Sequence, residues 1–229
     1  MSQRSLLMQP LVFVRYTPEE MLARAAAFCE EVRARRTVRE FSAEPISEDV
    51  LRRCIEAAAQ APSGANKQPW TFVLVTNPDV KQRIRAAAEE EERAFYGGRA
   101  SDRWLKDLEP LGTGWEKPFL EQAPALIVIF AQKHGPALVD SDGSNRSERH
   151  YYVSESVGIA VGLLLVALHH AGLAALTHTP SPMGFLADIL GRPENERPYL
   201  LVPVGYPAPG CEVPAVTRKP LDEVLITVR

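Results

Sequence analysis

The chain has 229 residues, of which 45% are hydrophobic and 24% are charged, and its formal net charge is −3. These values are typical of a soluble globular protein, and they give no basic field that would attract nucleic acid or an anionic membrane. Three widely spaced cysteines form neither a disulfide framework nor a zinc motif, so a reducing cytoplasm is the expected location. The first sixteen residues show no signal-peptide pattern, and the most apolar stretch, 157–168, is shorter than the roughly 20 residues of a membrane-spanning helix.

The first predicted element is a helix that ends near Ala34. Residues 17–20, Thr-Pro-Glu-Glu, match the capping box with proline at the first helical position, and apolar residues follow at helical spacing. Four arginines then fall within residues 33–39. A solvated helix end that offsets the helix dipole explains them, and an anion site is the alternative, because guanidinium groups suit phosphate oxygens.

A decapeptide at residues 61–70, Ala-Pro-Ser-Gly-Ala-Asn-Lys-Gln-Pro-Trp, connects a helix that starts after Ser47 to a strand at 71–76. Two prolines and a glycine predict irregular backbone between these two elements. Gly64 is expected to let the backbone approach a flat ligand closely, while Ser63 and Asn66 offer short hydrogen-bonding side chains. An ordinary helix-to-strand turn is the alternative.

The next helix starts at Pro78 and is predicted to end near Tyr96, after a run of four glutamates at 89–92 that is typical of a solvated helix face. Residues 97–118 then lose periodicity but contain Trp104 and Trp115. Such a segment is either a disordered insertion or a mobile cover over a site. The tryptophans favour the cover, because disordered segments rarely carry so much apolar surface.

The second half of the chain predicts one α+β domain without internal repeats. A helix at 157–171 is apolar on nearly all sides, so it is expected in the core or, preferably, against a second subunit. The other predicted elements are a buried central strand at 125–130, a surface loop at 133–149, a strand beginning at 174–176, a short helix at 183–190, a buried strand at 199–204 and a terminal strand at 224–228 that pairs at a sheet edge or with a partner chain.

Four motifs carry a resemblance: Arg35-Arg36-Thr37, Pro62-Ser63-Gly64-Ala65-Asn66, Thr177-His178-Thr179 and Arg218-Lys219-Pro220-Leu221-Asp222. With them the chain resembles the flavin-dependent nitroreductase superfamily from about Thr37 onward. The narrower set of Glu92, Tyr96 and Lys117 is similar to the iodotyrosine deiodinase family. The resemblance implies a three-layer sandwich with a central mixed sheet, in an intertwined homodimer that exchanges C-terminal strands. It also implies a single domain over residues 1–229, with a helical extension at 1–34 and an active-site lid at about 92–118.

The resemblance further implies one FMN at each of two subunit interfaces and no metal. It places Arg35, Arg36, Thr37, Arg39 and Arg218 at the phosphate and ribityl chain, Pro62, Ser63 and Gly64 along the isoalloxazine, Thr177 against the ring system, and Thr179 as the catalytic hydroxyl at flavin N5. In the lid, Glu92 would accept from an amino acid's ammonium group, Lys117 would pair with its carboxylate, Tyr96 would pack over its ring, and Ala65 would donate its N–H to a phenolate. His178 departs from the threonine run of the relatives, and its ring is expected to point into the core rather than alter the flavin potential.

Three functions are compared. The first is an FMN-dependent oxidoreductase that reductively dehalogenates halogenated tyrosine, with electrons from NAD(P)H or another donor. The second is a broad-specificity NAD(P)H-dependent nitroreductase or quinone reductase in which the lid is incidental. The third is a non-enzymatic binder of flavin or of aromatic amino acids. The first is preferred, because three matching positions fall on one predicted cover.

Overall fold

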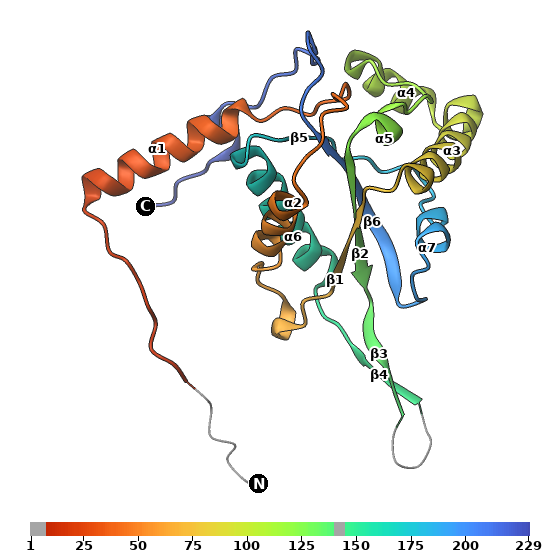
Figure 1. Cartoon of the computed structure of the whole chain (residues 1–229). Coiled ribbons are helices and arrows are strands. Elements are labelled where there is room, and N and C mark those ends of the chain that lie inside the picture. The colour runs from red at the N-terminus through yellow and green to blue at the C-terminus, as the bar shows by residue number, and fades with distance from the viewer. Residues whose placement is uncertain (1–7, 140–144) are drawn as a thin grey trace. The chain divides into compact units, whose positions relative to one another are not determined.

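A computed structural model describes residues 8–139 and 145–229 (Figure 1). The chain divides into two compact units, Met1–Arg35 and Arg36–Arg229. The first unit contains helix α1, Pro18–Ala34, and the predicted capping box is confirmed. The Thr17 hydroxyl accepts from the Glu20 N–H at 3.3 Å, and the Thr17 N–H donates to the Glu20 carboxylate at 2.8 Å.

The second unit is built on a four-stranded sheet with the order β1-β2-β6-β5. The predicted strands at 71–76, 125–130 and 199–204 are confirmed, with small changes at their ends. All strand pairs in this sheet are antiparallel, and an isolated parallel bridge from Thr37 to Ala175 makes it mixed. The strands are β1 Trp70–Val75, β2 Ala125–Gln132, β5 Ala174–Ala175 and β6 Glu196–Gly205.

Helices cover both faces of this sheet and form the predicted three layers (Figure 1). Because side chains alternate along a strand, Ile127 and Ile129 of β2 pack towards α2 and α6, while Val128 and Phe130 pack towards α3, α5 and α7. All four are fully buried. The helices are α2 Glu48–Ala58, α3 Pro78–Ala94, α5 Phe119–Gln122, α6 Val153–His170 and α7 Phe185–Ile189.

Helix α6 has one buried side and one apolar side that the single chain leaves open. Val157 and Leu164 are fully buried, whereas Ile159 and Leu163 remain 47% and 40% exposed. By length and composition alone α6 could also cross a membrane, but core helices pass the same test, so this is weak evidence. The prediction of a helix apolar all round is therefore correct in composition, and only part of its surface is covered within the chain.

The predicted surface loop at 133–149 is wrong for the residues that the structure describes. Strands β3, His134–Val139, and β4, Asn145–Arg149, pair antiparallel as a separate two-stranded sheet, and residues 140–144 lie outside the described ranges. This hairpin does not join the main sheet, so its sequence lacks the alternation that a core-facing strand carries. Its polar residues therefore resemble a loop.

One further prediction needs correction. The stretch 97–118 is not irregular, since it contains the π-helix η2, Phe95–Arg99, the helix α4, Asp102–Leu108, and the 3-10 turn η3, Glu109–Leu111. The terminal strand at 224–228 does not form within the described chain, and its pairing with a partner chain stays a prediction. Val224, the first residue of the predicted strand, belongs to helix α8, Leu221–Val224. Ile226 and Val228 are 89% and 91% exposed. An extended segment becomes a strand only with a hydrogen-bonding neighbour, and this chain provides none there.

Candidate active site

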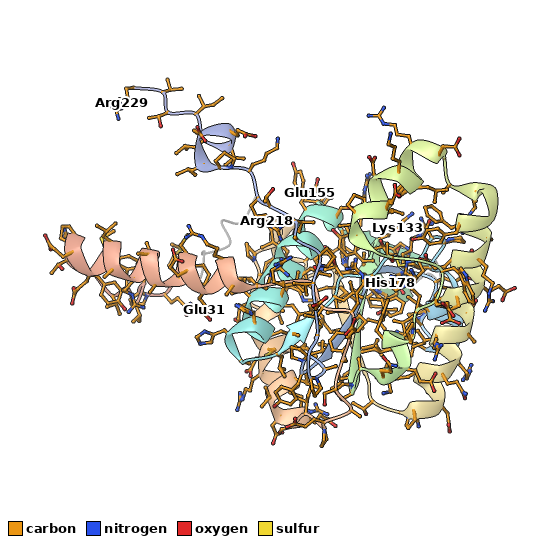
Figure 2. The ribbon with its side chains drawn as sticks, turned by 90° about the horizontal axis from the view of Figure 1, so that it is seen from above. Glu31, Lys133, Glu155, His178, Arg218 and Arg229 are labelled. Carbon is orange, nitrogen blue, oxygen red and sulfur yellow. The ribbon has the colours of Figure 1, made fainter. Side chains whose placement is uncertain are left out.

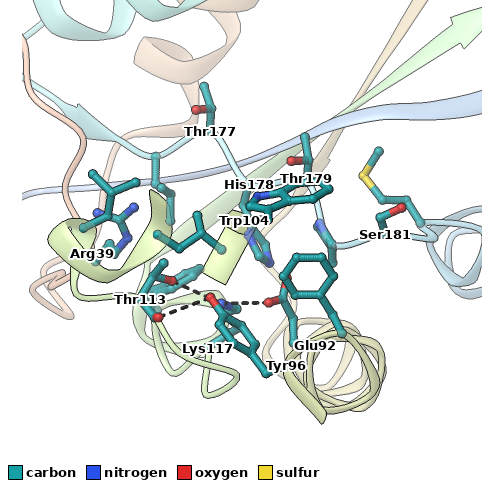
Figure 3. A pocket seen from close by; sticks show the side chains of 17 residues that line it. Arg39, Glu92, Tyr96, Trp104, Thr113, Lys117, Thr177, His178, Thr179 and Ser181 are labelled. Atoms are coloured by element: carbon teal, nitrogen blue, oxygen red, sulfur yellow. Dashed lines mark hydrogen bonds and ion pairs between the residues drawn. The ribbon is translucent and has the colours of Figure 1, made fainter. Parts of the chain in front are cut away.

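A cavity of about 430 Å³ lies between the predicted lid, residues 92–118, and the segment that follows β5 (Figure 3). Its walls come from the C-terminal end of α3, from η2 and α4, from the chain that enters α5, and from residues 176–183, with Arg39 at one side. Its volume is in the range of small-molecule sites. Six residues predicted for cofactor or substrate binding line it: Arg39, Glu92, Tyr96, Lys117, Thr177 and Thr179.

The most buried charges in this cavity are Lys117 and Glu92. Lys117 Nζ lies 3.1 Å from Glu92 Oε2, and the two side chains are 4% and 12% exposed. Burial lowers the pKa of Lys117 from its ordinary value, and Glu92 opposes this shift. The ammonium also contacts the Gly114 carbonyl. A cation and an anion are thus held side by side in a poorly solvated site, where each depends on the other for charge compensation.

A neighbouring glutamate fixes the backbone beneath this pair. The Lys117 N–H donates to Glu89 Oε1 at 2.8 Å, and Arg85 Nε donates to the same oxygen at 2.8 Å. Burial raises the pKa of Glu89, but these donors outweigh burial, so the pKa is lowered. The glutamate run at 89–92 is therefore not simply a solvated helix face, because Glu89 and Glu92 both point inward from α3 and bind the chain at Lys117.

Tyr96 completes the lid side of the cavity. Its hydroxyl donates to the Thr113 carbonyl at 3.2 Å, and its ring centroid lies 5.6 Å from Lys117 Nζ (Figure 3). Phe95 packs edge-on against both Tyr96 and Trp104, with centroids 5.3 and 5.2 Å away. The structure thus brings together three of the four residues that the resemblance assigns to the substrate, all but Ala65, and it adds an aromatic wall that sequence reasoning missed. An aromatic residue directly before Tyr96 was the available signal.

The opposite side of the cavity carries the threonines. Thr177 and Thr179 are exposed and line the cavity, while His178 between them is only 8% exposed. This alternation follows from extended backbone, which is fixed by paired hydrogen bonds between His178 and Leu201 of 2.8 and 3.0 Å. The His178 ring packs edge-on against Phe119. As predicted, the ring is buried, but it also lines the cavity.

The loop at Pro62, Ser63, Gly64 and Ala65 does not line this cavity. A Cβ at Gly64 would lie 2.6 Å from the Tyr151 carbonyl, so close approach of the chain itself already requires glycine here, and the approach of a flat ligand stays a prediction. Ser63 Oγ accepts from the Gln68 N–H at 2.9 Å. Ala65 and Asn66 adopt left-handed backbone, with φ of 50° and 53°. Such conformations in residues other than glycine often mark functional loops.

The arginine cluster predicted from the sequence is spread over several environments. Arg35 is the C-cap residue of α1 and belongs to the first unit, whereas Arg36 belongs to the second and donates to the Pro214 carbonyl. The backbone at 40–42 is also hydrogen-bonded to 206–208, so this segment runs beside the chain that leads to the exposed Arg218 (Figure 2). Of these arginines, Arg39 alone lines the described cavity, and burial lowers its pKa.

The donor set fits a flavin mononucleotide. Thr177 and Thr179 line the same cavity as Arg39, and guanidinium groups suit a phosphate. Thr37 lies next to this set through its bridge to Ala175. These are the group types that bind a phosphate and tune a flavin ring.

Arg99 is a lid residue that sequence reasoning missed. Its guanidinium donates to the Glu91 carboxylate at 3.0 Å, to the Glu91 carbonyl at 2.9 Å and to the Ser181 carbonyl. It therefore connects η2, α3 and the segment that carries Thr179. Nothing in the sequence distinguishes it from any other exposed arginine.

Arg99→Ala is expected to weaken ligand binding by about tenfold, because the lid loses a charge-assisted clamp to the opposite wall. FMN content should stay unchanged. Affinity measured by flavin absorbance, together with the rate of proteolysis within the lid, checks this. Arg103→Ala, on exposed α4, is the matched control. Equal affinity and equal proteolysis in the two variants would contradict a clamping role.

Comparisons with known proteins agree with this geometry. The family model described as "Nitroreductase family" matches residues 32–206. The iodotyrosine deiodinase of Haliscomenobacter hydrossis is 55% identical over 217 residues, which cover 95% of this chain and 96% of that protein. Iodotyrosine deiodinase 1 of Homo sapiens is 44% identical over 220 residues, which cover 96% and 74%.

Solved structures give the same assignment. A crystal structure of oxidized iodotyrosine deiodinase bound to FMN and 3-iodo-L-tyrosine has a TM-score of 0.71 and 30% identity, and covers 88% of this chain and 97% of that chain. A nitroreductase with bound FMN from Bacteroides fragilis shares the fold, with a TM-score of 0.64 at 22% identity over 88% and 98% of the two chains. The chain therefore belongs to the nitroreductase family, and the relatives it matches over most of its length are iodotyrosine deiodinases.

Proposed function

We propose that this protein is an FMN-dependent oxidoreductase that removes halogen from halogenated tyrosine by reduction. The observation that carries this proposal is the buried pair of Lys117 and Glu92, with Tyr96 beside it, in the same cavity as Thr177 and Thr179. A cofactor site and a site for a charged amino acid are then adjacent. The deiodinase relatives support this choice of ligand.

The charged pair suits a zwitterion. In the chain alone, Lys117 and Glu92 neutralise each other across 3.1 Å. An amino acid brings one cation and one anion, so Glu92 can take the ammonium and Lys117 the carboxylate while every buried charge keeps a partner. A ligand with only one charge would leave one side chain without compensation. Tyr96 packs over the ligand ring, and the Ala65 N–H donates to the phenolate oxygen.

The remaining predicted residues hold the cofactor. Arg35, Arg36, Thr37, Arg39 and Arg218 bind its phosphate and ribityl chain, Pro62, Ser63 and Gly64 lie along the isoalloxazine, and Thr177 lies against the rings. FMN, when bound, supplies electrons to the aromatic ligand. Thr179 donates its hydroxyl to flavin N5 and is the proposed catalytic residue. The carbon–halogen bond breaks, two electrons and one proton enter, and tyrosine and halide leave.

The electron donor and the assembly are part of the proposal. NAD(P)H or another reductant supplies the two electrons, and the cytoplasmic location stays a prediction. We propose a homodimer in which the exposed face of α6, around Ile159 and Leu163, packs against its equivalent. The exposed tail at 225–229 then pairs with the partner's sheet, which accounts for a β-rich sequence that has no neighbour within the described chain.

The test is to purify the protein, record its visible spectrum and titrate it with 3-iodotyrosine. We expect the flavin bands to change on titration. After reduction we expect tyrosine and iodide to form in equal amounts. Nitroarene turnover with NAD(P)H far above halotyrosine turnover would instead support the broad nitroreductase. A colourless protein that still binds tyrosine would support the third function, a non-enzymatic binder of aromatic amino acids.

A further inference from the structure

His178 contains an unpaired buried atom that the proposed function does not use. Among the buried side-chain nitrogens and oxygens that the structure describes, those of residues 8–136 and 147–229, its Nε2 alone has no hydrogen-bond partner. Native structures rarely leave such an atom unpaired, and a ligand that completes it is one of the standard explanations. The residue is only 8% exposed and lines the cavity, while Nε2 itself is covered in the chain alone. A molecule bound in the cavity is therefore the partner that becomes available once the groups over this nitrogen shift.

The position of the ring is fixed by the fold. Two backbone hydrogen bonds to Leu201 hold the main chain, and Phe119 packs edge-on with its centroid 5.4 Å from that of the imidazole. Because neighbouring residues of extended backbone point to opposite sides, the ring points away from the side of Thr177 and Thr179. It lies instead in the part of the cavity that holds Lys117 and Glu92 (Figure 3).

The charge environment selects the role of this nitrogen. Burial, together with the nearby cations Lys117 and Arg39, lowers the pKa of His178 from its ordinary value to about 3. The imidazole is therefore neutral at physiological pH, with one nitrogen that donates and one that accepts. An ammonium group can only donate, so it would pair with this ring through the nitrogen that accepts.

We infer that His178 is a specificity-determining residue for the ammonium end of the ligand: its Nε2 accepts a hydrogen bond from the amino group of the bound amino acid, beside Glu92. This inference rests on the proposed amino-acid ligand and names a contact for it. A neutral acceptor adds selectivity for an amine without disturbing the balance between Lys117, Glu92 and the zwitterion.

The experiment compares two ligands that differ only in the amino group. They are 3-iodotyrosine and 3-(4-hydroxy-3-iodophenyl)propanoic acid, titrated into the FMN-loaded protein by flavin absorbance. His178→Leu removes the hydrogen-bond acceptor and keeps the bulk of the side chain. It is expected to weaken the binding of 3-iodotyrosine by about tenfold and the binding of the desamino acid by less than about twofold. His178→Gln, which can place an amide oxygen near the Nε2 position, should recover most of the loss.

The control is His150→Gln, because His150 is also buried but its ring contacts the Gln132 carbonyl at the base of the β3–β4 hairpin. No change for either ligand is expected there. If His178→Leu weakened the binding of both ligands equally, the inference would be overturned, because His178 would then position Lys117 rather than contact the amino group. Unchanged affinities would overturn it as well. Failure of the unaltered protein to bind 3-iodotyrosine would reject the proposed function itself.

A measurement on the unaltered protein guards against a misfolded variant. In protein with ¹⁵N-labelled histidine, the Nε2 resonance of His178 is expected to shift on addition of 3-iodotyrosine and to stay in place with the desamino acid. The resonance is assigned by its loss in His178→Gln. A resonance that does not respond to 3-iodotyrosine, or that responds equally to both ligands, would contradict the proposed contact.

Discussion

Lys117→Met is expected to weaken 3-iodotyrosine binding by about 100-fold or more while FMN remains bound. Removing one member of a buried charged pair leaves the other without compensation and deprives the ligand carboxylate of its partner, and losses of this kind are among the largest that single substitutions cause. Glu92→Gln should have a similar effect through the ligand ammonium. Flavin absorbance titration measures the affinity, and the visible spectrum reports the FMN content.

A double variant, Lys117→Met with Glu92→Gln, separates the effect on ligand binding from the effect on stability. Lys117→Met alone leaves Glu92 buried without its cation, so the free energy of unfolding should fall. Lys117→Met with Glu92→Gln removes both charges, so stability should return towards that of the unaltered protein while ligand affinity does not. Lys106→Met, on the exposed surface of α4, is the control. Binding that survives in either single variant would disprove the role assigned to the lid.

Leu163→Glu is expected to give a monomer that no longer retains FMN. The side chain is 40% exposed on the open face of α6, so a charge there costs the isolated chain little but is unfavourable in an apolar interface. Because the resemblance places each FMN between two subunits, loss of the dimer should release it. Light scattering gives the mass, and the visible spectrum gives the cofactor content.

Gly162→Leu tests the same face without a charge. Outside the neighbouring turns of α6, a Cβ at Gly162 meets no atom of the described residues within 4 Å, so a larger side chain fits the monomer and obstructs close packing with another helix. Arg83→Glu, on exposed α3 in the opposite layer, should remain dimeric and yellow. A Leu163→Glu protein that is still a dimer with full FMN would place the interface elsewhere.

Elements with their own local signals were predictable from the sequence. Thr17 and Glu20 form the expected capping box, and Asn77 caps α3 through its side chain at 3.1 Å from the Val80 N–H. The continuous apolar run at 125–130 marked a strand buried on both faces. The β3–β4 hairpin and the tail were missed for one reason. Their pairing, or its absence, depends on what lies beside them rather than on their own pattern.

The candidate site was predictable only in part. Glu92 and Lys117 meet because α3 ends where the chain enters α5, and no local pattern specifies this contact; the family resemblance alone brought them together. The resemblance likewise supplied Thr177 and Thr179. It gave no sign of the Arg99 clamp or of the unpaired nitrogen in His178, because both depend on the distances between segments that are remote in sequence.

The attachment of Lys117 to α3 also determines which part of the site can open. Its N–H is held by Glu89, and Arg85 holds that carboxylate in turn, so both ends of the stretch 95–116 are tied to the same helix. A ligand can therefore enter when residues 95–116 move away from the cavity. Lys117 and Glu92 keep their distance from each other during this movement. Lys117 and Glu92 then bind the charged groups of the amino acid, and residues 95–116 control the entry of its ring.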